Sequence, residues 1–144
     1  MIRDILKQKG QGVLTISPDA SLEGAADKMA ARGVAALFVL DAHGAIEGVI
    51  SEREIIQMIA EFGARALAVS VGDAMQKSPP TVEASDSLRR AMQVMTHNRV
   101  RHLAVVDGEE VVGVVSIGDV VKSRLEDLEI EANVLRDVYI AAAH

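Results

Sequence analysis

The chain has 144 residues, of which 49% are hydrophobic, 25% charged and 2% aromatic; it has no cysteine and a formal net charge of −6. Without cysteine it can form no disulfide, thiolate metal site or cysteine nucleophile, and its acidic balance and few aromatic residues argue against nucleic-acid binding. No apolar run reaches the ~18 residues that span a bilayer and no signal-peptide core begins the chain, so we expect a cytoplasmic protein that does not enter a membrane.

The chain is a tandem repeat. A shift of 66 residues brings the two halves into register up to residue 41, and the shift falls to 65 after a turn in which one residue has been lost. This ordered agreement predicts two copies of one structural unit. The matched pairs include Thr15 and Thr81, Ser21 and Ser87, Met29 and Met95, Leu37 and Leu103, and Ser51 and Ser116.

Each half predicts the element order β-α-β-β-α. A short extended segment precedes a helix that Ser21 or Ser87 can cap, and the apolar residues of this helix recur three and four positions apart. Two apolar strands joined by a turn with Asp and Gly follow, and a second helix closes the unit. The strands span 13–16, 36–40 and 46–50 in the first half, and 80–82, 103–106 and 111–115 in the second. Since so small a unit buries too little apolar surface alone, we expect an α/β (α+β) fold whose halves share one core.

The last helix of each half begins at a serine that precedes an acid by three residues: Ser51 with Glu54, and Ser116 with Asp119. Ser-x-x-Glu is the pattern of a capping box, which needs no ligand. A helix N-terminus also offers unpaired backbone N–H groups and the positive end of a dipole to a phosphate, and a carboxylate one turn later can accept hydrogen bonds from ribose hydroxyls. From the residues alone, both interpretations stay open.

A long helix is predicted at the C-terminus, because the chain has neither Gly nor Pro from Val121 onward. Its apolar residues alternate between spacings of four and three, which is a heptad seam. The seam consists of Val121, Leu125, Leu128, Ala132, Leu135 and Val138 or Tyr139. This apolar stripe needs a partner, which is its own module, a neighbouring subunit or a separate protein.

Two stretches carry a resemblance to a known family. They are "VGDAMQKSPPTVEASDSLRRAMQVMTHNRVRHLAVVD" with "GVVSIGDVV" in the second half, and "TISPDASLEGAADKMAARGVAALFVLD" with "GVISEREII" in the first. In these stretches the chain resembles a stand-alone CBS domain pair, or Bateman module. The resemblance implies repeats at 8–63 and 73–126 packed with pseudo-two-fold symmetry, a lead-in N-terminal helix, and a helical extension at 127–144 for oligomerisation, commonly as a homodimer.

The resemblance also implies a function. Paired CBS domains usually regulate rather than catalyse, and they bind adenosine-containing ligands (AMP, ADP, ATP, S-adenosylmethionine or NAD(H)) in two clefts between the repeats. In the preferred cleft, Asp119 would hold the ribose and Ser116 the phosphate, and Gly118 would let the backbone approach closely. The apolar walls of this cleft would be Val13, Leu14, Ile16, Val34, Ala35 and Val114. The plain alternative is that these apolar residues belong to the core.

The second cleft departs from the family pattern, because Glu54 stands where Asp is usual. Glu is longer by one methylene and suits a capping box, so we expect it to act as a cap. Arg53 can bind a phosphate through two parallel hydrogen bonds, which makes this cleft the expected site of the polyphosphate end. It would be formed by Val49, Ser51, Arg53, Glu54, Pro80, Thr81, Val100, Arg101 and His102. Alternatively, Arg53 is a solvated surface charge and His102 a histidine at a strand end with no ligand.

We therefore expect a cytoplasmic homodimer that senses adenine nucleotides without catalysis, in which ligand binding shifts the packing of the repeats and a protein target responds to that shift. The alternative is a structural or scaffolding homodimer with vestigial pockets. An enzyme is the weakest hypothesis, because the sequence shows no nucleophile beside a base, and the remaining histidines lack metal-ligand spacing.

Overall fold

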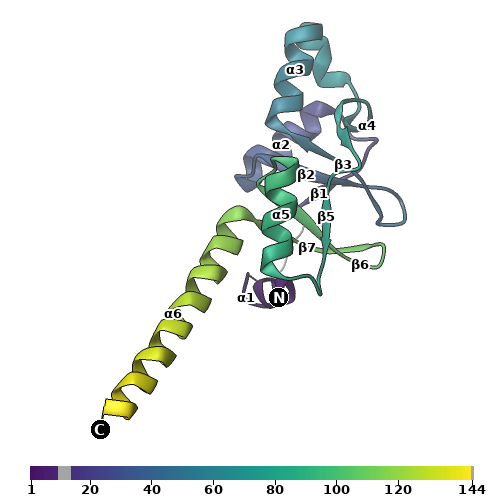
Figure 1. Cartoon of the computed structure of the whole chain (residues 1–144). Coiled ribbons are helices and arrows are strands. Elements are labelled where there is room, and N and C mark those ends of the chain that lie inside the picture. Colours follow the sequence, from purple (N-terminus) through teal and green to yellow (C-terminus); the bar gives the residue numbers. More distant parts are fainter. Residues whose placement is uncertain (10–13, 144) are drawn as a thin grey trace.

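The computed structural model describes residues 1–9 and 14–143 (Figure 1). After α1 (Ile2–Lys9), the first repeat contains β1 (Thr15–Ile16), α2 (Leu22–Arg32), β2 (Ala36–Leu40), β3 (Ile46–Ser51) and α3 (Glu52–Phe62). The connection contains the 3-10 helix η1 (Gly63–Ala68), α4 (Val71–Ala74) and β4 (Gln76–Lys77). The second repeat contains β5 (Thr81–Glu83), α5 (Leu88–Asn98), β6 (His102–Asp107), β7 (Glu110–Ser116) and α6 (Ile117–Ala143). The predicted order β-α-β-β-α and both terminal helices are confirmed.

Each repeat forms its own small sheet with the same pairing. β1 is parallel to β2, which is antiparallel to β3, and β5, β6 and β7 follow the same scheme. A register shift falls at matching places, between Val39 and Leu40 and between Val105 and Val106. β4 adds an antiparallel edge strand to β3. The symmetry of the sequence therefore extends to the details of strand register.

The predicted serine caps are present on the first helix of each repeat. Ser21 Oγ accepts the N–H of Gly24 at 3.1 Å, and Ser87 Oγ accepts the N–H of Arg90 at 3.0 Å. Each hydroxyl satisfies one of the backbone N–H groups that a helix start leaves unpaired. The two helices then bury the residues spaced for one face, among them Leu22, Ala25 and Met29 in α2 and Leu88, Ala91 and Met95 in α5.

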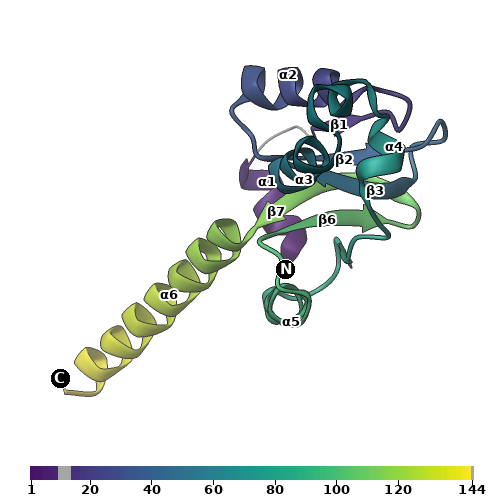
Figure 2. The ribbon, with the colours of Figure 1, turned by 90° about the horizontal axis from the view of Figure 1, so that it is seen from above.

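The two sheets meet through the faces that point away from α2 and α5. Phe38 lies between two strand residues that face the helix-side core, so its own side chain points to the opposite face, and it is buried. Ala104 and Val106 in β6 alternate with core residues in the same way and are also buried. Figure 2 shows the strands of both repeats between α2 on one side and α5 on the other. The buried residues form two core clusters, one in each repeat, so the expectation of one shared core is wrong. Phe38, Ala104 and Val106 are buried outside these clusters, on the opposite sheet faces.

α1 packs on the second repeat, although it precedes the first in the chain. Ile2 and Ile5 are buried in the core of the second repeat, whereas Val71 of α4 fills the matching place in the first. The same backbone hydrogen bonds hold both helices: Ile2 N–H to the carbonyl of Asp86 and Arg3 N–H to Ala84, and Val71 N–H to Ala20 and Gly72 N–H to Pro18. Each repeat is therefore completed by a helix from outside its β-α-β-β-α unit.

Asp41 organises the turn between β2 and β3. One carboxylate oxygen, Oδ1, accepts the backbone N–H groups of His43 at 2.8 Å and Ala45 at 2.9 Å. The hydrogen bond from Ala45, followed by that from His43, holds the pKa of Asp41 below its ordinary value of 3.8, because both favour the charged carboxylate.

Replacing Asp41 with Ala should lower the melting temperature at neutral pH and have no effect in strong acid. Because the pKa is lowered in the folded state, the contribution is fully present well above pH 3.8 and is lost as the pH falls through the folded-state value. Thermal unfolding across this range measures it. Asp107→Ala is the control, since Asp107 is the exposed residue at the matching end of β6. If Asp41→Ala lowered the melting temperature by the same amount at every pH, the role of the Asp41 carboxylate would be contradicted.

Candidate functional site

The helix that closes the first repeat, α3, begins with a hydrogen-bonded Ser–Glu pair. Glu54 Oε1 accepts the backbone N–H of Ser51 at 2.8 Å and the Ser51 hydroxyl at 2.7 Å. Glu54 is 5% exposed and lies in the first helical turn, where the dipole favours a carboxylate. The interpretation of Glu54 as a helix cap is confirmed.

The helix that closes the second repeat, α6, begins with the corresponding Ser–Asp pair. Asp119 Oδ2 accepts the backbone N–H of Ser116 at 2.9 Å, and Ser116 Oγ accepts the N–H of Asp119 at 3.1 Å. Both helix starts thus have the reciprocal pattern of a capping box, and the Ser51 hydroxyl in addition donates to the Glu54 carboxylate. Asp119 is half-buried where Glu54 is buried. The two copies of the motif therefore differ mainly in the access of solvent to the acid.

A cavity of about 190 Å³ adjoins Asp119 between α1 and α6. Its walls are Ile5, Gln8, Asp119, Lys122, Ser123 and Glu126. These walls offer the two carboxylates of Asp119 and Glu126, one ammonium, one amide and one hydroxyl, which suit a ligand that carries hydroxyl groups. Sequence reasoning missed Gln8 and Lys122. Lys122 follows Asp119 by three residues, a spacing that puts both on one helix face, whereas nothing in the sequence connects Gln8 with this place.

Backbone pairing decides which strand end lies beside each helix start. Ser116 is opposite His102 in the β6–β7 register, and the Ile117 N–H donates to the carbonyl of Arg101 at 2.8 Å. In the first repeat, Glu52 N–H donates in the same way to the carbonyl of Ala35 at 3.0 Å. The structure therefore brings Arg101 and His102 beside Ser116, and Ala35 beside the start of α3. Both Arg101 and His102 are exposed.

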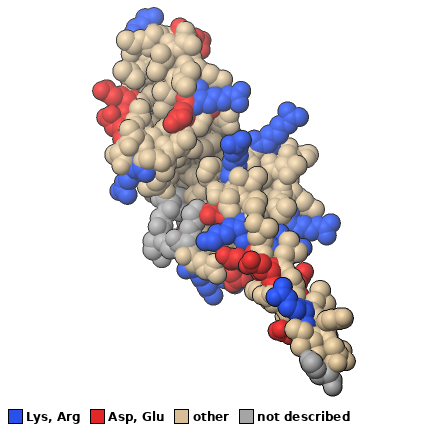
Figure 3. Space-filling model, turned by 90° about the vertical axis from the view of Figure 1, so that its left-hand side faces the viewer, with Lys and Arg blue, Asp and Glu red and all other residues tan. Residues whose placement is uncertain are grey.

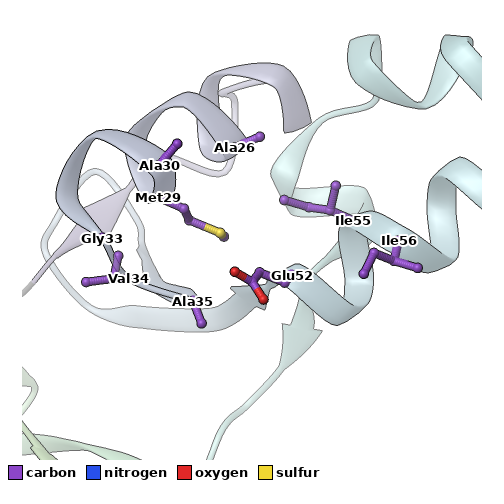
Figure 4. Close-up of a pocket in the computed structure, with 9 residues that line it drawn as sticks. All are labelled: Ala26, Met29, Ala30, Gly33, Val34, Ala35, Glu52, Ile55 and Ile56. Carbon is purple, nitrogen blue, oxygen red and sulfur yellow. The ribbon is translucent and has the colours of Figure 1, made fainter.

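Val34 and Ala35 line a larger cavity, of about 480 Å³, that belongs to the first repeat (Figure 4). Figure 4 shows Met29 of α2 and Glu52 of α3 on facing sides of it. The remaining wall is apolar and contains Ala26, Ala30, Gly33, Ile55 and Ile56. The residues that line this cavity do not include Asp119, so these two preferred-site residues stand in a different cavity from the carboxylate.

The other candidate residues lie along the strands and their ends. Val49 is paired with Phe38 and Val114 with Ala104, which places both half-buried valines on the sheet faces that the repeats share. The half-buried Leu14 and Ile16 pack against the core of the first repeat, and Val100 against that of the second. Pro80 and Thr81 are half-buried before and in β5, while Arg53 and Gly118 are exposed in first helical turns. Val13 lies outside the described residues.

Two other kinds of feature, metal-ligand clusters and membrane-spanning helices, are absent from the described part of the chain. Within residues 1–9 and 14–143, no three His, Asp or Glu side chains gather as metal ligands would. In the same ranges, no helix joins the length and the apolarity that a bilayer crossing demands. The helix start at Ser116 and Asp119 is thus the strongest candidate for binding a small molecule.

Three comparisons describe what this chain is similar to. A family model for the CBS domain matches residues 2–61 and 71–126. CBSX3, a mitochondrial CBS domain-containing protein of Arabidopsis thaliana, is 35% identical over 130 residues, which are 85% of this chain and 63% of that protein. The crystal structure of the CBS-domain protein ATU1752 from Agrobacterium tumefaciens has a TM-score of 0.78 and 36% identity, covering 85% of this chain and 92% of that one. PAE2072 from Pyrobaculum aerophilum, solved in complex with AMP, has a TM-score of 0.72 and 25% identity, covering 82% and 88%.

Proposed function

Because the chain belongs to the CBS domain family, we propose that it is a non-catalytic regulatory module that binds an adenosine-containing ligand. The observation that carries the proposal is the second helix start, where Asp119 borders a cavity at the N-terminus of α6. The AMP complex of PAE2072 supports this ligand class. We propose AMP as the first candidate, followed by ADP, ATP, NAD(H) and S-adenosylmethionine.

In this proposal Asp119 accepts hydrogen bonds from the ribose hydroxyls, and the phosphate lies near the N–H groups of the first turn of α6. Gly118 is exposed there and presents no side chain to the ligand. We assign the guanidinium of Arg101 to the phosphate of this same cleft, since the backbone of Arg101 lies beside Ser116. Lys122 supplies a second positive charge in the Asp119 cavity.

The regulatory output in this proposal is a change in how the two repeats, 8–63 and 73–126, pack on each other within a homodimer. A ligand that binds at Asp119 more tightly in one arrangement of the repeats than in another favours that arrangement, and a protein target binds it differently. The extension 127–144 takes part in the dimer. We propose the cytoplasm as the location, although the Arabidopsis relative CBSX3 is named as a mitochondrial protein.

A second candidate function is that of a structural homodimer. The observation that favours it is Glu54, whose carboxylate is 5% exposed and accepts two hydrogen bonds from Ser51. A carboxylate held in this way does not reach a ribose, so the first cleft keeps Arg53 as its main polar group. If the second cleft were equally unable to bind, the dimer surface would be the function.

Thermal unfolding with added ligand separates the two candidates. A ligand that binds the native state alone stabilises it by about 2.7 kcal/mol at 100 times its dissociation constant, which raises the melting temperature by roughly 5–10 °C for a chain of this size. We expect AMP to give such a shift and guanosine monophosphate, the control, a smaller one. If AMP, ATP, NAD(H) and S-adenosylmethionine all left the melting temperature unchanged, the sensor function would be wrong and the structural one favoured.

A further inference from the structure

α6 continues far beyond the repeat to which its first turns belong. Val120 is buried, and Ser123 and Glu126 are half-buried, but every residue from 127 to 143 is exposed. Figures 1 and 2, at right angles to each other, both show this part of the helix projecting from the body. Most of the stability of a helix in a protein comes from packing of its apolar face, so this part of α6 calls for a packing partner.

The projecting helix carries a continuous apolar seam. Leu125 is 58% exposed, Leu135 69% and Tyr139 76%. These residues form one stripe along the helix, unlike the single apolar residues that are normally scattered over a protein surface. The seam residues occupy alternate a and d positions of a heptad: Leu125, Ala132 and Tyr139 at a, and Val121, Leu128 and Leu135 at d. The seam starts on the module itself, because Val121 lies in the same turns of α6 as the buried Val120.

We propose that α6 pairs with α6 of a second copy of this chain as a parallel, in-register, two-stranded coiled coil. The inference rests on the homodimer of the proposed function and is independent of its ligand. In this arrangement each seam residue meets its own counterpart, and the seam is covered from Val121 to Tyr139. The two modules then lie at the same end of the coiled coil.

The charges beside the seam favour this partner and this direction. In a parallel coiled coil, the residue at position g of one helix lies beside the residue five positions later, at e, of the other. Arg124 then pairs with Glu129 of the second copy, and Glu131 with Arg136 of the second copy. Both pairs have opposite charges and each occurs twice by symmetry. All four residues are exposed, and Figure 3 shows acidic and basic side chains interspersed along the projecting helix.

The antiparallel alternative fits less well. A centred antiparallel pair, with Leu125 opposite Leu135, brings Glu129 beside Glu129 and Glu131 beside Glu131 of the second copy. Like charges at these positions oppose pairing. Antiparallel registers that avoid these contacts shorten the overlap and leave part of the seam exposed. The charge pattern and the length of the seam therefore agree on the parallel arrangement.

Cysteine cross-linking of the full-length chain tests the direction, since the chain has no cysteine of its own. Leu135→Cys places two sulfur atoms at one d layer of the parallel coiled coil, within the Cα separation that a disulfide bridges. Asn133→Cys is the matched control, since it lies on the same exposed turn but outside the seam. We expect at least about a tenfold faster disulfide dimer for Leu135→Cys under mild oxidation. Equal rates, or a monomer by light scattering, would overturn the proposal in favour of a helix that packs on its own module or a separate protein.

Charge exchange tests the partner. In the Leu135→Cys background, an acidic variant (Arg124→Glu with Arg136→Glu) and a basic variant (Glu129→Arg with Glu131→Arg) each place like charges at all four pairs. Alone, each should cross-link several-fold more slowly, and an equal mixture should recover the rate as a heterodimer. If both variants cross-linked alone at the original rate, the charge pairs would not hold the helices together, and the proposed coiled coil would be wrong. The AMP shift of the melting temperature should be the same in all of them, so a failed coiled coil and a failed ligand site give different results.

Discussion

Replacing Asp119 with Ala is expected to weaken AMP binding by about 10- to 100-fold, because hydrogen bonds to a charged group contribute about 1.5–3 kcal/mol. Asp119 also accepts the backbone N–H of Ser116. The substitution should therefore also lower the free energy of unfolding by about 1 kcal/mol through loss of a helix cap. Asp119→Asn separates the two effects, since an amide oxygen can still accept that N–H while the negative charge is lost. Titration calorimetry with AMP measures the affinity, and urea unfolding measures the stability.

Glu54→Ala is the matched control for Asp119, since Glu54 is the corresponding acid of the other repeat. It should lower the free energy of unfolding by about 1–2 kcal/mol through the loss of a buried cap, because the Ser51 N–H and hydroxyl lose their acceptor. The affinity for AMP should remain unchanged. Equal losses of affinity in Asp119→Ala and Glu54→Ala would mean that the two clefts take part alike and that the preference for the second is wrong.

Gly48→Ala should be among the most destabilising single substitutions in the chain. A Cβ at Gly48 would lie 2.5 Å from Met75 Sδ and 2.6 Å from the backbone carbonyl oxygen of Gln76. The Met75 side chain can move, but the carbonyl belongs to β4, which pairs with β3 at this point. We expect a loss of about 3 kcal/mol, at the upper end for overpacking, as a lower urea midpoint at unchanged slope.

Gly113→Ala is the internal comparison, because Gly113 is the equivalent residue of the second repeat. Its new Cβ would also approach within 2.5 Å of another atom, but that atom is Leu6 Cδ2, at the end of a side chain on α1. A leucine can change rotamer and a helix can shift slightly, so we expect a loss of about 1 kcal/mol. The reverse order of the two losses would show that α1 is held more rigidly than β4.

The architecture could be predicted from the sequence because helix caps and apolar periodicity are short-range patterns and each pattern occurs in both halves. Ser21 and Ser87 cap the helices they were expected to cap, and the alternation of apolar residues defines the buried sides of the strands. The amphipathic helix at the N-terminus was expected too. Its place on the second repeat was not, because Ile2 contacts residues some eighty positions later and the apolar face of a short amphipathic helix can pack on either repeat.

The candidate site was predictable to the extent that it lies within one segment. Ser116 and Asp119 could be singled out because their spacing has a chemical meaning by itself. The sequence could not show that Arg101 lies beside Ser116, since that depends on the β6–β7 register. Nor could it show that Val34 and Ala35 line a cavity of their own, or that Gln8 borders Asp119, because those neighbours come from different elements.

The crossed position of α1 determines how this chain can be divided. A cut in the connection at residues 63–80 would separate two repeats that are similar in sequence but unequal as folding units. The N-terminal piece would keep α4 only if the cut fell after it, while the C-terminal piece would lose Ile2 and Ile5 from its core in every case. The smallest autonomous unit is therefore the pair. α1 thus ties the first residues of the chain to the second repeat, so a C-terminal half expressed alone would lack part of its core.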